Sequence, residues 1–256
     1  MTTVHVERYL ERIRYGGWVR PDLATLAALQ RAHLTTVPFE NLDVYYRTGV
    51  EVGPEWALAK VLGGRGGWCF ELNTAFAELL GAIGFDVSLR AAEVLFGDVP
   101  PETPDHLTLQ VTIDGRPWLV DVGFGDASCR PLALDVEDPQ DGESRPYRVR
   151  RDDGFVVLEA ETDGAWHRQY RFRPDDVDLD VFEPASARLQ HTEGLHWTQT
   201  RFATRLFPGG RVTQLHDRLK FIRDAGISEE PIDEDRWHVE LDAWYDMRGF
   251  APVDRA

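Results

Sequence analysis

The feature that most constrains the fold of this chain is a change of hydrophobic period near residue 86. Before it, apolar residues recur every three to four positions over 4–14, 23–34, 55–62 and 69–83. After it, apolar and polar residues alternate over 87–95, 106–113, 147–151, 155–160 and 166–172. We therefore predict an α+β fold, with a helical section over 1–86 and an antiparallel β-meander or barrel over 87–186. The last section, 187–256, mixes short helices with a hairpin over 212–215 and 219–222.

The segment Arg65–Asn73 (Arg-Gly-Gly-Trp-Cys-Phe-Glu-Leu-Asn) places a thiol at the start of the last predicted helix. Its glycine pair interrupts the chain, and the helical period runs from Cys69 to a stop at Gly84. A thiol in the first turn lies beside unpaired N–H groups and the positive end of the helix dipole, which favour the thiolate, and Arg65 adds a cation. We interpret Cys69 as a nucleophile, although a free cysteine is often only a buried space-filling residue, and this segment alone leaves both readings open.

A second candidate site lies in a predicted hairpin. Asp121 stands in an apolar run, Trp118–Val122, where an unpartnered carboxylate costs several kcal/mol, so it needs a donor. Asp114-Gly115 is a typical two-residue hairpin turn, and it pairs positions whose numbers sum to 229. That register places His106 on the same face as Asp121, diagonally across the ladder and within reach of a hydrogen bond. One bulge would break this inference, and a purely structural pair is the alternative interpretation.

A carboxylate that orients an imidazole is what a nucleophile–base system requires, and Cys69 is the best candidate for the nucleophile. A metal site is not expected. The chain has no HExxH or CxxC motif, and His191, His196, His216 and His238 lack ligand-like spacing.

The charge and the cysteine content of the chain limit which partners and which cellular location can be expected. The chain has 28 Lys+Arg against 44 Asp+Glu, a formal charge of -16, which argues against nucleic acid and anionic membrane as partners. No stretch approaches the roughly 18 uninterrupted apolar residues of a membrane span. The first residues lack the basic and apolar regions of a signal peptide, and the two cysteines, Cys69 and Cys129, form no disulfide framework. We therefore expect a cytoplasmic protein.

Several motifs together resemble those of a known family, the arylamine N-acetyltransferases. They are Val37-Pro38-Phe39-Glu40-Asn41-Leu42-Asp43, the Arg65–Asn73 segment, a His at the head of a strand, and Val120-Asp121-Val122-Gly123-Phe124-Gly125. The similarity spans at least residues 5–134 and continues more weakly through 210–215 and beyond.

The resemblance implies that Cys69, His106 and Asp121 form a catalytic triad, arranged as in cysteine proteases. It also implies a helical bundle (1–86), a β-barrel (87–186) and a C-terminal α/β lid (187–256). Phe39, Val94 and Phe124 are then expected to line an apolar acceptor pocket. Backbone N–H groups near the start of the Cys69 helix are candidates for an oxyanion hole.

The activity that the resemblance implies is ping-pong acyl transfer through an acyl-cysteine. Acetyl-CoA is the expected donor and co-substrate, coenzyme A is the product, and a small arylamine or hydrazine is the acceptor. Three alternatives remain at this point: a cysteine hydrolase or transglutaminase-like enzyme, an amide synthase that releases a carrier-bound polyketide onto an aryl amine, and a binding protein with a degenerate triad. A homo-oligomer is compatible with the sequence.

Overall fold

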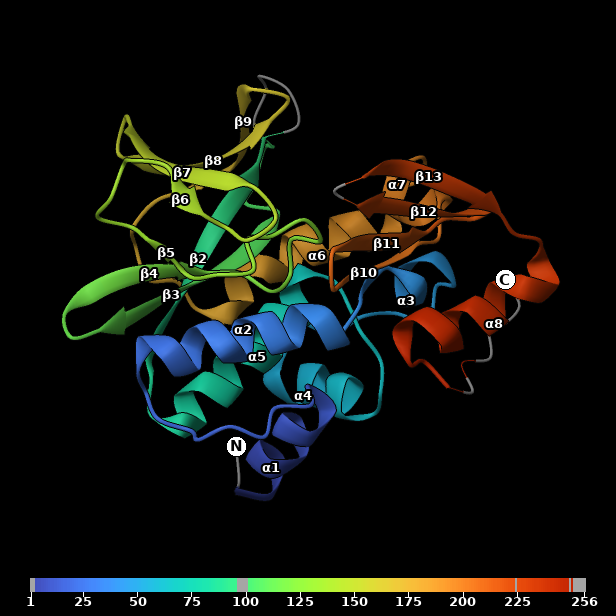
Figure 1. Cartoon of the computed structure of the whole chain (residues 1–256), viewed down its shortest axis with the longest axis horizontal. Coiled ribbons are helices and arrows are strands. Elements are labelled where there is room, and N and C mark those ends of the chain that lie inside the picture. The colour runs from blue at the N-terminus through green and yellow to red at the C-terminus, as the bar shows by residue number, and fades with distance from the viewer. Residues whose placement is uncertain (1–2, 96–100, 224, 249, 251–256) are drawn as a thin grey trace.

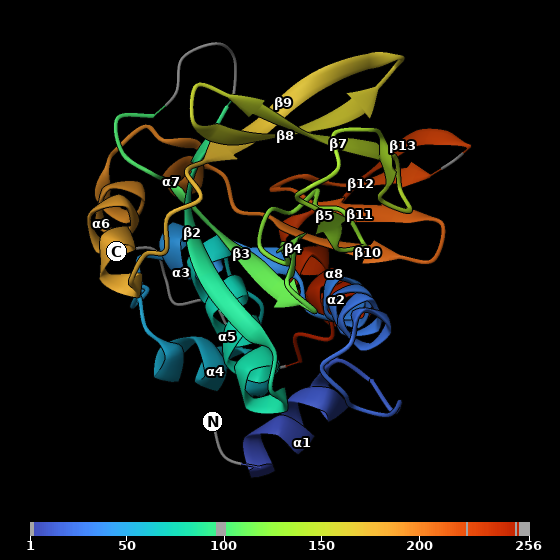
Figure 2. The ribbon, with the colours of Figure 1, turned by 90° about the vertical axis from the view of Figure 1, so that its left-hand side faces the viewer.

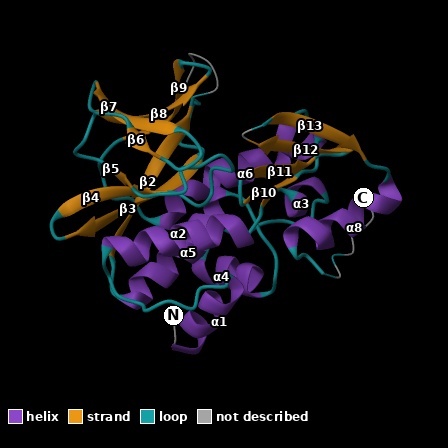
Figure 3. Cartoon of the chain, in the orientation of Figure 1, coloured by secondary structure: helices purple, strands orange, loops and turns teal. Residues whose placement is uncertain are grey.

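The computed structural model describes residues 3–95, 101–223, 225–248 and 250. Figure 1 shows the helices of the first section below, a strongly curved sheet at the upper left and a smaller sheet with one long helix at the right. Figure 3, coloured by secondary structure, shows the same arrangement, with the two sheets lying above the helical section. The predicted α+β class is confirmed.

The helical section is built around its most buried helix, α5. Its helices are α1 (Thr3–Arg12), α2 (Leu23–Thr36), α3 (Leu42–Tyr45), α4 (Pro54–Leu62) and α5 (Cys69–Ile83). α5 contacts α1 and α4 on one side and the strands β2 (Asp86–Val94) and β3 (His106–Ile113) on the other. Its Leu72, Phe76 and Leu79 are fully buried in the same core cluster. Since every residue from Cys69 to Phe76 is buried, the first two turns of α5 are held from both sides, and the N-terminus of the helix is fixed between the helices and the sheet. The four helices expected from the period are present, whereas the single turn α3 falls where a connection was expected.

The first sheet is antiparallel and nearly closed on itself. Within the described residues its strands are β2 (Asp86–Val94), β3 (His106–Ile113), β4 (Arg116–Val120), β5 (Leu132–Ala133), β6 (Gln140–Asp141), β7 (Pro146–Asp152), β8 (Phe155–Thr162) and β9 (Ala165–Phe172), in the spatial order β5-β4-β3-β2-β9-β8-β7-β6. Leu119 and Leu132 near one end share a core cluster with Tyr147 and Val149 near the other, so the sheet curls around its own apolar face. Figure 2 shows β2 and β3 lying alongside α5.

The second sheet joins early and late parts of the chain. Its described strands are β1 (Phe39–Glu40), β10 (Ala203–Phe207), β11 (Gly210–Gln214), β12 (Arg218–Arg223) and β13 (Gly226–Pro231), in the order β1-β10-β11-β12-β13. The 3-10 helix η1 (Leu179–Phe182) and the helices α6 (Glu183–His191), α7 (His196–Gln199) and α8 (Glu234–Tyr245) complete the described elements. The predicted hairpin over 212–215 and 219–222 is present as β11 and β12, with Val212 opposite Phe221. β1, β10 and β13 were not predicted.

The boundaries 1–86, 87–186 and 187–256 remain a prediction. Phe39 of β1 pairs with Thr204 of β10, and Phe182 of η1 packs against Phe70 of α5, so contacts tie the three ranges together. None of the helices in the described part of the chain combines the length and hydropathy needed to cross a membrane.

Candidate active site

Cys69 is the first residue of α5, and the glycine pair before it is required by close packing. A Cβ at Gly66 would lie 1.9 Å from the Pro38 carbonyl oxygen, and one at Gly67 would lie 2.5 Å from Oε2 of Glu71. Neither position accepts a larger residue without moving backbone or a buried carboxylate. The chain therefore enters the helix along a fixed path. Cys69 is 6% exposed, and its Sγ lies 3.9 Å from the Asp105 carbonyl oxygen.

The first turn of α5 leaves two backbone donors available. The N–H of Trp68 donates to Oε2 of Glu71 at 3.1 Å. In the part of the chain that is described, no hydrogen bond engages the N–H of Cys69 or of Phe70. Such groups at a helix N-terminus suit an oxygen that becomes negative during a reaction. Arg65, expected to add a cation here, is bonded to Glu40 and Asp43 instead, so carboxylates already compensate its charge.

His106 and Asp121 meet as the hairpin register predicted. Ile113 lies opposite Arg116, and the pairing continues to Leu109 opposite Val120. The turn residues Asp114 and Gly115 have φ angles of 52° and 78°, as a two-residue turn of this kind requires. Nε2 of His106 lies 2.7 Å from Oδ2 of Asp121, and both side chains are buried.

Asn73 ties this hairpin to the helix that carries the thiol. Its Nδ2 donates to Oδ1 of Asp121 at 3.0 Å and to the Leu107 carbonyl at 2.6 Å, while its Oδ1 accepts from the Val122 N–H at 2.9 Å. Oδ1 of Asp121 also accepts from the Gly123 N–H at 2.9 Å. Sequence reasoning missed this role, although Asn73 is a polar residue one helical turn after Cys69 on a largely apolar helix.

The electrostatics of the site favour a charged imidazole. Burial alone lowers the pKa of His106, but the Asp121 carboxylate and the Cys69 thiol outweigh it and raise that pKa to about 10. Burial raises the pKa of Asp121, yet its interaction with His106 brings the net shift below the ordinary value. Because Nε2 is engaged by Asp121, Nδ1 remains for the thiol. The arrangement can hold a thiolate beside an imidazolium.

Of the three predicted pocket residues, Phe124 packs against the His106 ring, and Phe39 and Val94 contact residues that adjoin Phe124 and His106 in the chain. The ring of Phe124 is 5.2 Å from that of His106, and a Cβ at Gly125 would come 3.1 Å from the Phe39 ring. The Val94 N–H donates to Oδ1 of Asp105 at 2.9 Å, next to His106 in the chain. Their role in binding an acceptor remains a prediction.

Further aromatic rings that sequence reasoning did not identify also lie here. Tyr170 is 4.9 Å from the His106 ring, and Trp197 and Phe202 are 6.0 and 5.8 Å from the Phe39 ring. No spacing in the sequence links them to the triad residues. Among the described residues, no group of three or more His, Cys, Asp or Glu side chains is placed to hold a metal ion.

Comparison with known proteins gives consistent matches. A family model described as N-acetyltransferase matches residues 22–240. The chain is 36% identical over 185 residues to an arylamine N-acetyltransferase of Mycolicibacterium smegmatis, covering 68% of this chain and 67% of that protein. It is 30% identical over 219 residues to an arylamine N-acetyltransferase of Escherichia coli, covering 81% and 75%. The structure of the Mycobacterium marinum arylamine N-acetyltransferase in complex with CoA superimposes with a TM-score of 0.87 at 26% identity, covering 94% of this chain and 92% of that one.

Proposed function

The chain belongs to the arylamine N-acetyltransferase family, and from that membership we propose that it transfers an acetyl group from acetyl-CoA to the nitrogen of an arylamine or arylhydrazine. The observation that carries the chemistry is the buried His106–Asp121 pair beside the thiol at the start of α5. Coenzyme A as the carrier is supported by the related Mycobacterium marinum enzyme, which has been solved in complex with CoA.

In the first half-reaction, the Cys69 thiolate attacks the thioester carbonyl carbon of acetyl-CoA. The carbonyl oxygen becomes an oxyanion, and the N–H groups of Cys69 and Phe70 are positioned to stabilise it. When the tetrahedral intermediate collapses, the bond to the CoA sulfur breaks. His106 donates its Nδ1 proton to that sulfur, and the enzyme is left as a Cys69 thioester with a neutral imidazole.

In the second half-reaction, the amine nitrogen attacks the acetyl carbon of the Cys69 thioester. His106 accepts the proton of the amine at Nδ1, and the Cys69 sulfur leaves as a thiolate. Asp121 remains ionised throughout and holds the ring by Nε2. The cycle ends with the thiolate–imidazolium pair with which it began.

Phe39, Val94 and Phe124 are proposed to form the acceptor side of the site, where aromatic and aliphatic surface suits a flat amine and limits attack by water. A cytoplasmic location is proposed because the mechanism needs a reduced thiol, and Cys69 and Cys129 are both free.

The test is intact-protein mass spectrometry after incubation with acetyl-CoA. Wild type and Cys69→Ala are compared, with Cys129→Ala as the matched control for the second thiol. We expect one acetyl group on wild type and on Cys129→Ala, lost on addition of an arylamine, and none on Cys69→Ala. Equal labelling of wild type and Cys69→Ala, or no labelling of either, overturns the mechanism. Acylation only from a carrier-bound chain would identify an amide synthase instead.

A further inference from the structure

Glu71 is a buried carboxylate that holds the turn carrying the nucleophile. It is 1% exposed and lies in the first turn of α5. Its Oε2 accepts from the Trp68 N–H at 3.1 Å, and its Oε1 accepts from Trp56 Nε1 at 2.9 Å and from Lys60 Nζ at 2.7 Å. Because Glu71 occupies the N–H of Trp68, the next two N–H groups are the ones left for a reacting oxygen.

Lys60 is the cation that balances this carboxylate. Its side chain is 7% exposed, and its ammonium also lies 2.6 Å from Asp43 and 3.9 Å from Glu40. A carboxylate as buried as Glu71 is strongly destabilising once its cation is removed. Lys60 projects from α4, so it joins that helix to the first turn of α5.

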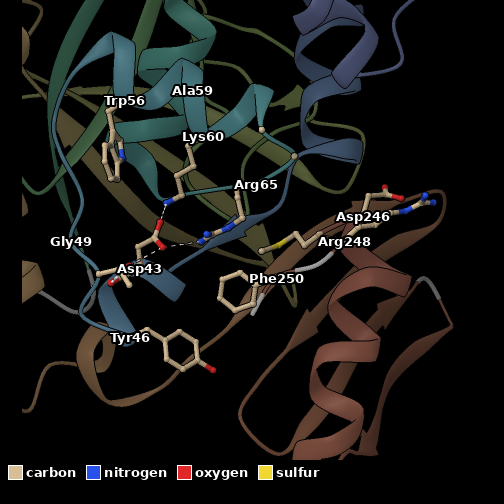
Figure 4. A pocket seen from close by; sticks show the side chains of 14 residues that line it. Asp43, Tyr46, Gly49, Trp56, Ala59, Lys60, Arg65, Asp246, Arg248 and Phe250 are labelled. Carbon is tan, nitrogen blue, oxygen red and sulfur yellow. Dashed lines mark hydrogen bonds and ion pairs between the residues drawn. The ribbon is translucent and has the colours of Figure 1, made fainter. Parts of the chain in front are cut away.

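Lys60 and Arg65 line a cavity of about 710 Å³. Figure 4 shows them together with Tyr46, Trp56 and Phe250, which line the same cavity. Both cations are already bonded to carboxylates: Lys60 to Asp43 and Glu71, and Arg65 to Glu40 and Asp43. Their charges therefore serve the loop that leads to Cys69 rather than a ligand in this cavity.

We propose that Lys60 is a positioning residue for the acetylation half-reaction. By holding Glu71 in place as the acceptor for the Trp68 N–H, it aims the N–H groups of Cys69 and Phe70 at the carbonyl oxygen of the incoming thioester. This inference rests on the proposed function. Release of the Trp68 N–H would let the first turn of α5 rotate, and displacement of a reacting group by about 1 Å can cost roughly 100-fold in rate.

The experiment measures the single-turnover rate of Cys69 acetylation by acetyl-CoA in wild type, Lys60→Met and two double variants. Lys60→Met leaves Glu71 without its cation, and we expect acetylation about 100-fold slower. Lys60→Met/Glu71→Gln removes one charge of each sign and keeps an oxygen that accepts from Trp68, so its rate should recover to within about tenfold of wild type. Lys60→Met/Glu71→Leu has the same net charge but no acceptor, and it should remain slow.

Arg248→Met is the matched control. Arg248 lines the same cavity, is 85% exposed and contacts Asp242 at 3.6 Å, so removing this cation should leave acetylation unchanged. A second measurement is the transfer of acetyl from the preformed Cys69 thioester to an arylamine, combined with thermal unfolding of each variant. If Lys60 has a positioning role, Lys60→Met slows acetylation by more than the drop in its melting temperature can explain.

Equal acetylation rates in the Gln and Leu double variants, both folded, overturn the inference, even where Lys60→Met alone fails to fold. The inference is also overturned if Lys60→Met is acetylated at the wild-type rate. The same holds if its loss of rate is fully explained by its loss of stability. Absence of acetylation on Cys69 in wild type is a different result, because it refutes the proposed function itself.

Discussion

At the scale of single residues, the site shows how a carboxylate is kept ionised inside an apolar strand. Asp121 is accommodated because three donors converge on it: the His106 ring, the Asn73 amide and the Gly123 N–H. Each bond favours the charged form, and together they offset the cost of burial. The same bonds fix the imidazole with one nitrogen free for the thiol.

Gly123 provides a sharp steric test of this packing. A Cβ there would lie 2.7 Å from the Cys69 Cα and 2.7 Å from Nδ2 of Asn73. We expect Gly123→Ala to displace Cys69 from His106 and to slow acetylation by about 100-fold, measured by quenched-flow mass spectrometry. Gly16→Ala is the control, since nothing lies within 4 Å of that Cβ. If Gly123→Ala were acetylated at the wild-type rate, the backbone at this position would be free to move.

At the scale of elements, the site is a contact between one helix and one hairpin. α5 supplies Cys69, Asn73 and Glu71 in its first two turns, and the β3–β4 hairpin supplies His106 with Asp121 just after β4. The bond from Asn73 to Asp121 spans 48 positions of the chain. The stability of α5 therefore bears directly on the geometry of the site.

Two glycines at the far end of α5 should respond in opposite directions to the same substitution. Gly81 lies inside the helix with nothing within 4 Å of its Cβ, so Gly81→Ala should stabilise the protein by about 0.5–1 kcal/mol. Gly84 ends the helix at a φ of 105°, so Gly84→Ala should destabilise it by about 1 kcal/mol or more. Urea unfolding measures both changes, and a shift of the same sign in the two variants would contradict the assignment of the helix end.

At the scale of the whole molecule, buried histidines link stability to pH with opposite signs. His106 has a folded pKa raised to about 10, so its contribution is complete below about pH 6.5 and is lost as the pH rises towards 10. His33 is buried between Tyr9 and Phe76, and neither of its ring nitrogens has a partner among the described residues. Burial, aided by Arg12, lowers the pKa of His33 to about 3.

Acid should therefore destabilise the fold through His33 before most carboxylates titrate. Between the ordinary value of 6.5 and about 3, the unfolded chain binds a proton at this position that the folded chain does not. Each pH unit in that window costs about 1.4 kcal/mol, so wild type should lose about 2 kcal/mol between pH 6.5 and 5. The free energy of urea unfolding, measured from pH 7.5 to 5, should fall more steeply in wild type than in His33→Leu. Equal slopes would mean that His33 is protonated inside the folded protein.

The sequence by itself determined the features that depend on residues close together in the chain. The glycine pair and the apolar period fix where α5 begins, and the Asp114-Gly115 turn fixes the register that brings His106 to Asp121. Other elements leave little local signal: α3 is one turn, β10 does not alternate between buried and exposed positions, and β13 is exposed at every position.

Only the tertiary structure decided how these parts meet. It brought the start of α5 against the hairpin through Asn73, balanced Glu71 with Lys60 from a neighbouring helix, and gathered Tyr170, Trp197 and Phe202 around the site. Such contacts arise from packing between segments that are distant in the chain. Packing depends on the shapes of whole surfaces, so a single sequence contains no period or spacing from which these contacts can be deduced.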